Sequence, residues 1–112
     1  MSNIPFQTID WDSVEKTEHI GTPGIAHWQT TQLDGLRIRK VTYSKDYMAD
    51  HWCRKGHSVH CLEGHFISEL ESGEQVQLSK GTTYIVSNDA CSHRSISANG
   101  VELLIIDGDF LK

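Results

Sequence analysis

Turn signals come at short and regular intervals along this chain, and this spacing constrains the fold more than any other feature of the sequence. From Ile25 onward, short runs rich in β-branched and aromatic residues alternate with Gly, Asn, Asp and Ser. Asp34 and Gly35, for example, are a hairpin signal between residues 25–33 and 36–44. Many short strands at this spacing predict an all-β sandwich or barrel.

The remaining expected strands follow the same rule, for a total of roughly nine. We expect one short helical turn near residues 11–17, capped by Asp10 or Asp12, and no convincing helical period after it. The chain then divides into an irregular N-terminal arm over residues 1–24 and a β-barrel over residues 25–112. The further strands are expected at residues 47–53, 57–63, 65–71, 74–78, 82–86, 91–97 and 101–106, with turns at 72–73 and 80–81 and loops at 87–89 and 99–100.

Size and charge exclude several classes of protein. The 112 residues are enough for one domain. Ten Lys and Arg against fifteen Asp and Glu give a formal charge of -5, so a nucleic-acid partner is not expected. No membrane association is expected either, because the longest apolar run, residues 101–106, contains Glu102 and is far shorter than the ~20 residues that span a bilayer.

The cellular location is inferred from the start of the chain and from its cysteines. Residues 1–5 lack the basic and apolar regions of a secretory signal, which predicts a cytoplasmic protein. Cys53, Cys61 and Cys91 are then expected to be thiols, and each is either core filler or a metal ligand.

The segment around Cys53 carries the strongest chemical signal. Strand alternation would put His51 and Cys53 on one face. A tight turn over residues 54–56, with Gly56 at positive φ, would make His57 a cross-strand neighbour of Cys53 with β-carbons ~5 Å apart. Zinc binds nitrogen and sulfur ligands tetrahedrally, and His93 on a later strand is the natural fourth ligand.

The other histidines and cysteines are not expected to bind the metal. His60 falls on the opposite face from His57, and His65 follows a turn at Gly64. His19 and His27 have no cluster of donors around them, and Cys61 is expected in the core. Cys91 shares a strand face with His93, so it is a candidate neighbour of the site or an alternative ligand.

At this segment the sequence resembles the cupin superfamily, whose first motif is G(X)5HXH(X)3-4E(X)6G. His51 stands at the first histidine, Cys53 at the second, and His57 at the glutamate. Gly64 matches the closing glycine, whereas Lys45 replaces the opening one. More narrowly, the chain resembles small single-domain cupins named for a DHCW motif, a group without a settled activity.

The second cupin motif, G(X)5PXG(X)2H(X)3N, is matched less closely. Gly81 matches, Ser87 and Asp89 replace the proline and glycine, His93 arrives one residue late, and Ser97 stands at the asparagine. The resemblance covers residues 25–107 and implies a single-domain cupin, a jelly-roll β-barrel also described as a double-stranded β-helix.

The resemblance also bears on the metal. Cupins with three histidines and a glutamate often hold iron, manganese or nickel, whereas a thiolate and an extra imidazole make a softer site. We therefore expect a divalent ion, Zn first, with Fe(II), Ni and Mn as alternatives. Iron would be held by His51, His57 and His93, with Cys53 as a neighbour.

Three functional hypotheses remain open at this stage. The first is a metal-dependent enzyme acting on a small molecule in the barrel, dioxygenase-like or isomerase-like, with Tyr43, Tyr84 or Glu63 as acid, base or orienting group. The second is a non-catalytic binding or sensor module with a closed, structural metal site. The third is an empty barrel whose histidines only form hydrogen bonds.

The resemblance also implies an assembly. Small cupins pair edge strands or exchange terminal arms to form dimers, so a homodimer is expected. Phe6, Ile9 and Trp11 give the N-terminal arm apolar side chains to bury in such a dimer.

Overall fold

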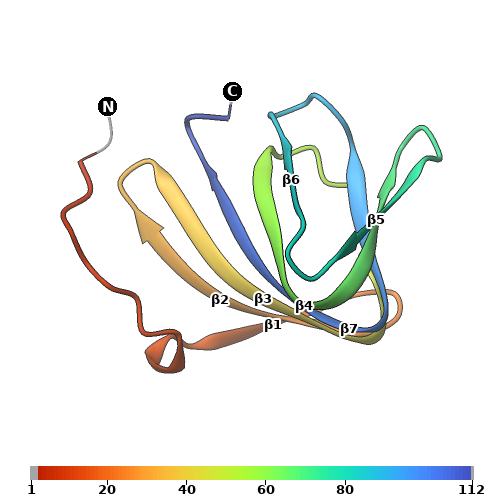
Figure 1. Cartoon of the computed structure of the whole chain (residues 1–112), viewed down its shortest axis with the longest axis horizontal. Helices are drawn as coiled ribbons and strands as arrows, with labels where there is room; N and C mark the ends of the chain where they lie inside the picture. Colours follow the sequence, from red (N-terminus) through yellow and green to blue (C-terminus); the bar gives the residue numbers. More distant parts are fainter. Residues whose placement is uncertain (1–2, 112) are drawn as a thin grey trace.

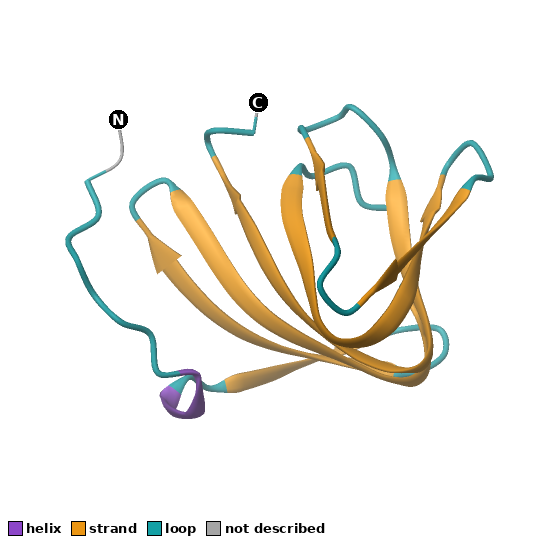
Figure 2. Cartoon of the chain, in the orientation of Figure 1, coloured by secondary structure: helices purple, strands orange, loops and turns teal. Residues whose placement is uncertain are grey.

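The computed structural model describes residues 3–111 and confirms the all-β prediction (Figures 1 and 2). Within these residues the only helical element is a 3-10 turn, and no helix is long and apolar enough to cross a membrane. The elements are η1 (Trp11–Ser13), β1 (Lys16–Ile20), β2 (Ile25–Leu33), β3 (Leu36–Met48), β4 (His57–Leu70), β5 (Gln75–Ser79), β6 (Thr83–Val86) and β7 (His93–Gly108).

The seven strands form one antiparallel sheet in the order β1-β2-β3-β7-β4-β5. β6 pairs with the first half of β4, and β5 pairs with its second half. Figure 1 shows the sheet curling over, so that β5 and β6 lie on one side of a concave interior and β1 to β3 on the other. Strands from the first and from the second half of the sequence therefore line the same interior.

The hairpin of β2 and β3 forms as predicted. Leu33 pairs with Leu36 across the turn, and the pairing continues to Ala26 and Tyr43. Gly35 takes φ 71, a conformation that glycine adopts without steric cost. The turns at Gly73 and Gly81 are also confirmed.

The expected break between strands 36–44 and 47–53 is wrong, because β3 runs from Leu36 to Met48. Two interruptions predicted at glycines are also wrong, because the chain continues through them. Gly64 lies inside β4 and Gly100 inside β7, so two pairs of expected strands become two long ones. Both glycines have positive φ, and the pairing register of β4 and β7 shifts beside Gly64. A Cβ on Gly64 would lie 2.8 Å from the carbonyl oxygen of Gly100. These glycines therefore permit irregular pairing within a curved sheet instead of ending a strand.

The N-terminal segment is more regular than expected. The predicted helical turn is confirmed as η1, capped by Asp10, whose side chain accepts a hydrogen bond from the backbone N–H of Asp12. The expectation of an irregular arm is wrong for β1, which pairs with β2 along its full length. Gln29 on β2 also donates hydrogen bonds from its side chain to the carbonyl oxygens of Trp11 and Val14. The segment is thus tied to the sheet of its own chain.

The hydrophobic core fills the concave side of the long strands. Val41, Val59 and Leu103 come from β3, β4 and β7, and they are almost completely buried. Cys61 is buried among them, as predicted. One end of the interior is polar, and the candidate site lies there.

Candidate metal centre and its cavity

Cys53 reaches the interior by a different route from the predicted hairpin. β3 ends at Met48, and Cys53 forms an isolated antiparallel bridge with His93 instead of pairing with His57. Gly56 is not at positive φ, contrary to the prediction. Its backbone lies against β6 and the following loop, and a Cβ at this position would come within 2.6 Å of the Val86 carbonyl oxygen. Close packing is therefore the reason for a glycine there.

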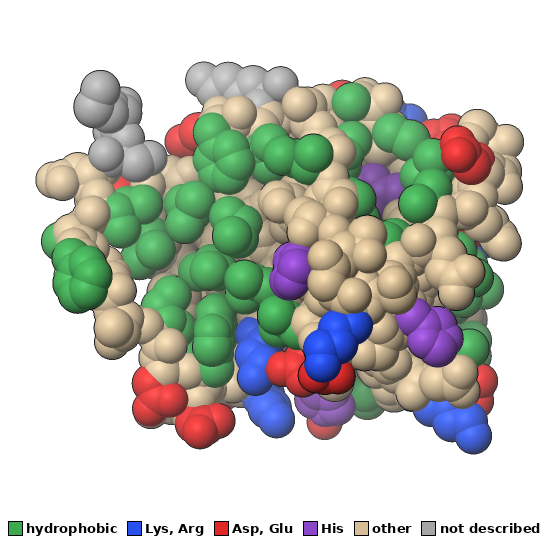
Figure 3. Space-filling view, viewed as in Figure 1, with side chains coloured by type: hydrophobic (Ala, Val, Ile, Leu, Met, Phe, Trp, Pro, Cys, Tyr) green, Lys and Arg blue, Asp and Glu red, His purple; other side chains and the backbone are tan. Residues whose placement is uncertain are grey.

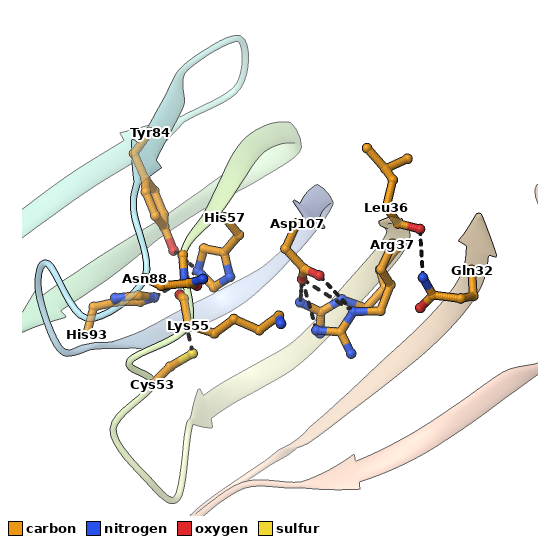
Figure 4. A network of polar contacts seen from close by, with 12 residues as sticks. Gln32, Leu36, Arg37, Cys53, Lys55, His57, Tyr84, Asn88, His93 and Asp107 are labelled. Carbon is orange, nitrogen blue, oxygen red and sulfur yellow. Dashed lines mark hydrogen bonds and ion pairs between the residues drawn. The ribbon is translucent and has the colours of Figure 1, made fainter. Parts of the chain in front are cut away.

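Cys53, His57 and His93 nevertheless converge, and their candidate ligand atoms all lie within 4.8 Å of one another. The Nε2 atoms of His57 and His93 are 2.8 Å apart. Both histidines are buried, with 6% and 4% of their surface exposed. Figure 4 shows how the three side chains approach from the loop before β4, from β4 and from the start of β7.

His51, the remaining predicted ligand, does not lie in this group. Its side chain is 78% exposed, and its Nδ1 lies 2.6 Å from a carboxylate oxygen of Asp50. The alternation argument fails because the chain bends at residues 50–51 and is no longer a strand. His51 still contributes to the wall of the adjoining cavity.

The two buried histidines are held differently. Nδ1 of His93 lies 3.0 Å from the carbonyl oxygen of Cys91, so a proton on Nδ1 leaves the lone pair of Nε2 directed at the group. Cys91 thus contributes its backbone to the site, and its thiol contacts the carbonyl oxygen of Ser92. Nε2 of His57 lies 3.1 Å from the Tyr84 hydroxyl, and Nδ1 of His57 is buried without a partner in residues 3–111.

The electrostatic surroundings favour the thiolate of Cys53 and the neutral imidazole of His57, which are the forms that bind a metal. Hydrogen bonding with His93 lowers the pKa of the Cys53 thiol. Burial lowers the pKa of His57 to about 3, and the nearby charges of His93 and Arg39 act in the same direction. Burial alone would lower the pKa of His93, but hydrogen bonds with the Cys53 side chain and the Cys91 backbone raise it overall.

The donor set fits a zinc-like ion. Tetrahedral nitrogen and sulfur ligands at ~2.0–2.3 Å from an ion lie roughly 3.3–3.8 Å from one another. The spacing of the three donors brackets this range, from 2.8 Å between the imidazoles to the 4.8 Å limit of the group. Cys53, His57 and His93 can therefore hold an ion after small side-chain adjustments, and they supply three protein ligands.

The tyrosines of the site remain protonated over a wide pH range. Burial raises the pKa of Tyr84 and of Tyr43. Burial also raises the pKa of Tyr47 to about 12, and its ring stacks on Tyr43 at 4.4 Å between centroids. Glu63, a third candidate acid or base, instead forms an exposed ion pair with Lys80.

The group opens onto a cavity of about 560 Å³. This volume lies within the usual range for small-molecule sites. Besides Cys53, His57 and His93, side chains of both charge types and several aromatic rings form its wall, among them Trp28, Arg37, Arg39, Tyr43, Lys55 and Tyr84.

The sequence analysis missed a charge cluster beside this cavity, in which Arg37 and Arg39 line the cavity and both pair with Asp107. Asp107 on β7 is 2% exposed and accepts hydrogen bonds from Arg37 at 2.9 Å and from Arg39 at 3.1 Å. In the sequence, Leu36 and Ile38 alternate with Arg37 and Arg39, a pattern that favours an outward polar face for the two arginines. In the structure, Arg39 lies on the inner face of β3 with Val41 and Tyr43. The spacing of two residues between Arg39, Val41 and Tyr43 was the sequence signal that could have predicted this.

Comparison with known proteins identifies the fold. No protein-family model and no curated protein sequence matches the chain. Among solved structures, it resembles an RmlC-like cupin from Shewanella frigidimarina, with a TM-score of 0.71, 19% identity, and coverage of 93% of this chain and 91% of that one.

Two named enzymes show the same likeness. The chain resembles ectoine synthase from P. lautus, with a TM-score of 0.72, 12% identity, and coverage of 90% of this chain and 76% of that one. It also resembles the polyketide cyclase RemF from Streptomyces resistomycificus, with a TM-score of 0.73, 12% identity, and coverage of 93% and 80%. The protein therefore has the cupin fold, as predicted. The narrower kinship with DHCW-motif cupins stays a prediction.

Proposed function

We propose that this protein is a metal-dependent enzyme that acts on a small molecule bound inside the barrel. One observation carries the proposal: the candidate ligand atoms of Cys53, His57 and His93 converge within 4.8 Å beside a cavity of about 560 Å³. Three protein ligands leave one tetrahedral position for a substrate, which is the usual arrangement of catalytic zinc sites.

Zinc is the ion that this donor set favours. One thiolate and two imidazoles are soft to intermediate ligands, and the lowered pKa of Cys53 helps to supply the thiolate. The three-histidine iron site loses support because His51 lies outside the group and its side chain is exposed. Fe(II), Ni and Mn remain the alternatives to be tested.

The residues around the candidate ligands supply hydrogen-bond donors that can act on a bound substrate. An ion held by the three ligands would supply Lewis-acid polarisation of a bound substrate. The hydroxyl of Tyr84, adjacent to His57, stays protonated and can donate a hydrogen bond. Tyr43 can do the same from β3, where its hydroxyl lies 3.4 Å from that of Ser95. Glu63 has no part in this proposal, because it pairs with Lys80 at the surface.

The structural neighbours support the choice of an enzyme. Ectoine synthase and a polyketide cyclase share this fold, so a barrel of this shape accommodates catalysis on small molecules. Because these identities are 12%, neither reaction is transferred to this chain. A cytoplasmic location is part of the proposal and agrees with three free thiols.

The alternative is a non-catalytic module with a closed metal shell, and the position of His51 is the observation that favours it. His51 lies on the wall of the same cavity, two residues before Cys53, in a bend outside the strands. A rotation of its side chain towards the group would supply a fourth protein ligand. A filled tetrahedral shell leaves no position for a substrate.

Cobalt substitution separates the two functions. The protein is purified without a histidine tag, loaded with Co(II), and its visible spectrum is recorded before and after addition of azide. The proposed enzyme predicts a four-coordinate spectrum that azide changes in wild type and in His51→Gln alike. A spectrum that ignores azide in wild type but responds in His51→Gln would instead establish the closed site.

A further inference from the structure

The charge cluster of Arg37, Arg39 and Asp107 beside the cavity has more positive than negative charge. Arg37 and Arg39 share one carboxylate, that of Asp107, which leaves one positive charge without a counter-ion. Lys55 also lines the cavity and contributes a third cationic side chain. The acidic residues of the same lining are Glu18, which lies 3.6 Å from His27, and Asp50, which lies 2.6 Å from His51. The part of the wall formed by the two arginines therefore favours an anion.

Arg39 is the side chain with hydrogen-bond donors that have no partner in the described part of the chain. It is 5% exposed, and within residues 3–111 only its Nη2 makes a hydrogen bond, to Asp107. Its Nε is buried without a partner. A buried guanidinium normally satisfies its donors, because leaving them unpaired is costly. Burial, and after it the neighbouring charge of Arg37, lower the pKa of Arg39, whereas the charge and the hydrogen bond of Asp107 raise it.

The position of Arg39 relates this charge to the metal group. Arg39 and the three candidate ligands line the same cavity. The guanidinium carbon of Arg39 lies 4.4 Å from the centre of the Trp28 ring, which holds the group in place.

We propose that Arg39, assisted by Arg37 and Lys55, binds the carboxylate of a small organic acid whose other polar group faces Cys53, His57 and His93. The inference rests on the proposed function and adds the chemical class of the substrate. A carboxylate matches the single uncompensated charge of the arginine pair and the planar donor geometry of a guanidinium. Phosphate, with its greater charge, is the competing anion to be tested.

The test measures carboxylate binding to the metal-free protein by NMR titration. Lactate is compared with lactamide, its neutral analogue, and with inorganic phosphate. Lactate is expected to bind at least about tenfold more tightly than lactamide, because a charge-assisted hydrogen bond is lost in the amide. Equal binding of the two, or tighter binding of phosphate, overturns the inference.

Variants of two arginines identify the residue responsible. Arg39→Gln should remove the preference for lactate over lactamide. Arg94→Gln is the matched control, because Arg94 also lines the cavity but is engaged by Glu69 at 2.6 Å, and it should keep the preference. Lactate binding that survives Arg39→Gln contradicts the inference. If Arg39→Gln does not fold, Lys55→Gln serves instead, since its side chain is exposed, and it should weaken lactate binding about threefold or more.

The outcomes for the two proposals are distinguishable. Selective lactate binding in a protein that takes up no metal would support the carboxylate site and refute the metal-dependent enzyme. Metal uptake without any preference for lactate would support the metal centre and refute the carboxylate site.

Discussion

The backbones of Cys53 and His93 hydrogen-bond to each other in both directions, at 2.7 Å from Cys53 N–H to the His93 carbonyl and 3.0 Å in reverse. This bridge fixes two candidate ligands that are distant in the sequence, and it does not depend on either side chain. Because the bridge uses only backbone atoms, the Cys53 thiol can be replaced to test metal binding without removing this contact from the fold.

The first prediction follows from this bridge. Cys53→Ser should leave the far-UV circular dichroism spectrum unchanged and weaken zinc binding by at least about 100-fold, because the hydroxyl is a poor ligand for zinc. Zinc affinity is measured by competition with a chromophoric chelator. Cys61→Ser, a change of the buried core thiol, is the control and should retain zinc affinity. Unchanged zinc affinity in Cys53→Ser would remove the thiolate from the site.

The second prediction concerns pH. The pKa of His57 is lowered to about 3 from an ordinary 6.5, so the unfolded chain takes up this proton first as the pH falls. The stability from neutral His57 is complete above pH 6.5 and is lost towards pH 3. Arg39 and Asp107, which act on His57, keep their charges over most of this range.

This effect is measured by urea unfolding of the metal-stripped protein. Between pH 7 and pH 4.5, wild type should lose about 1–3 kcal/mol more stability than His57→Gln. The raised pKa of His93 acts with the opposite sign, because its contribution is lost as pH rises, and it is present in both proteins. Parallel pH profiles of wild type and variant would show that His57 is not buried in its neutral form.

The third prediction concerns Gly56. A methyl group there would meet the backbone of Val86, Ser87 and Asn88 at 2.5–2.6 Å, so Gly56→Ala should destabilise the protein by about 2–3 kcal/mol. Gly73→Ala is the matched control, because that glycine has φ 97 but open space around it, and a loss of about 1 kcal/mol is expected. Urea midpoints measure both. Equal losses would show that the close packing of Gly56 is unimportant.

The fourth prediction concerns assembly, for which we propose a homodimer. Phe6 is 98% exposed, and Ile4 and Phe110 are also exposed apolar residues. Figure 3 shows hydrophobic side chains gathered on the face formed by β2, β3 and the end of β7. Light scattering should give a dimer for the full chain and a monomer after deletion of residues 1–9, which leaves η1 and β1 in place. A monomeric full chain, or a dimer that survives the deletion, contradicts this.

The sequence predicted local turns well and interruptions within strands poorly. Gly35 and Gly73 end strands because polar turn residues precede them and the chain reverses there. Gly64 and Gly100 have the same positive φ and similar local sequences. They differ only in that strands β4 and β7 pair on both sides of them, and pairing between distant segments is not encoded in a local pattern.

In the candidate site too, local patterns were predicted better than contacts between distant segments. His93 was predicted from the need for a distant ligand, and the structure brings it to Cys53 and His57. His51 was misplaced because alternation assumes a continuing strand. Arg39 and Asp107 were missed because 68 positions separate them, and only the pairing of β3 with β7 joins them.

The most direct test of the metal centre is the zinc content of untagged protein, measured by elemental analysis for wild type, His57→Gln and His51→Gln, with circular dichroism to confirm folding. Wild type and His51→Gln should each hold about one ion per chain, whereas folded His57→Gln should hold almost none. Zinc retained by His57→Gln, or lost from His51→Gln alone, would contradict a centre built from Cys53, His57 and His93.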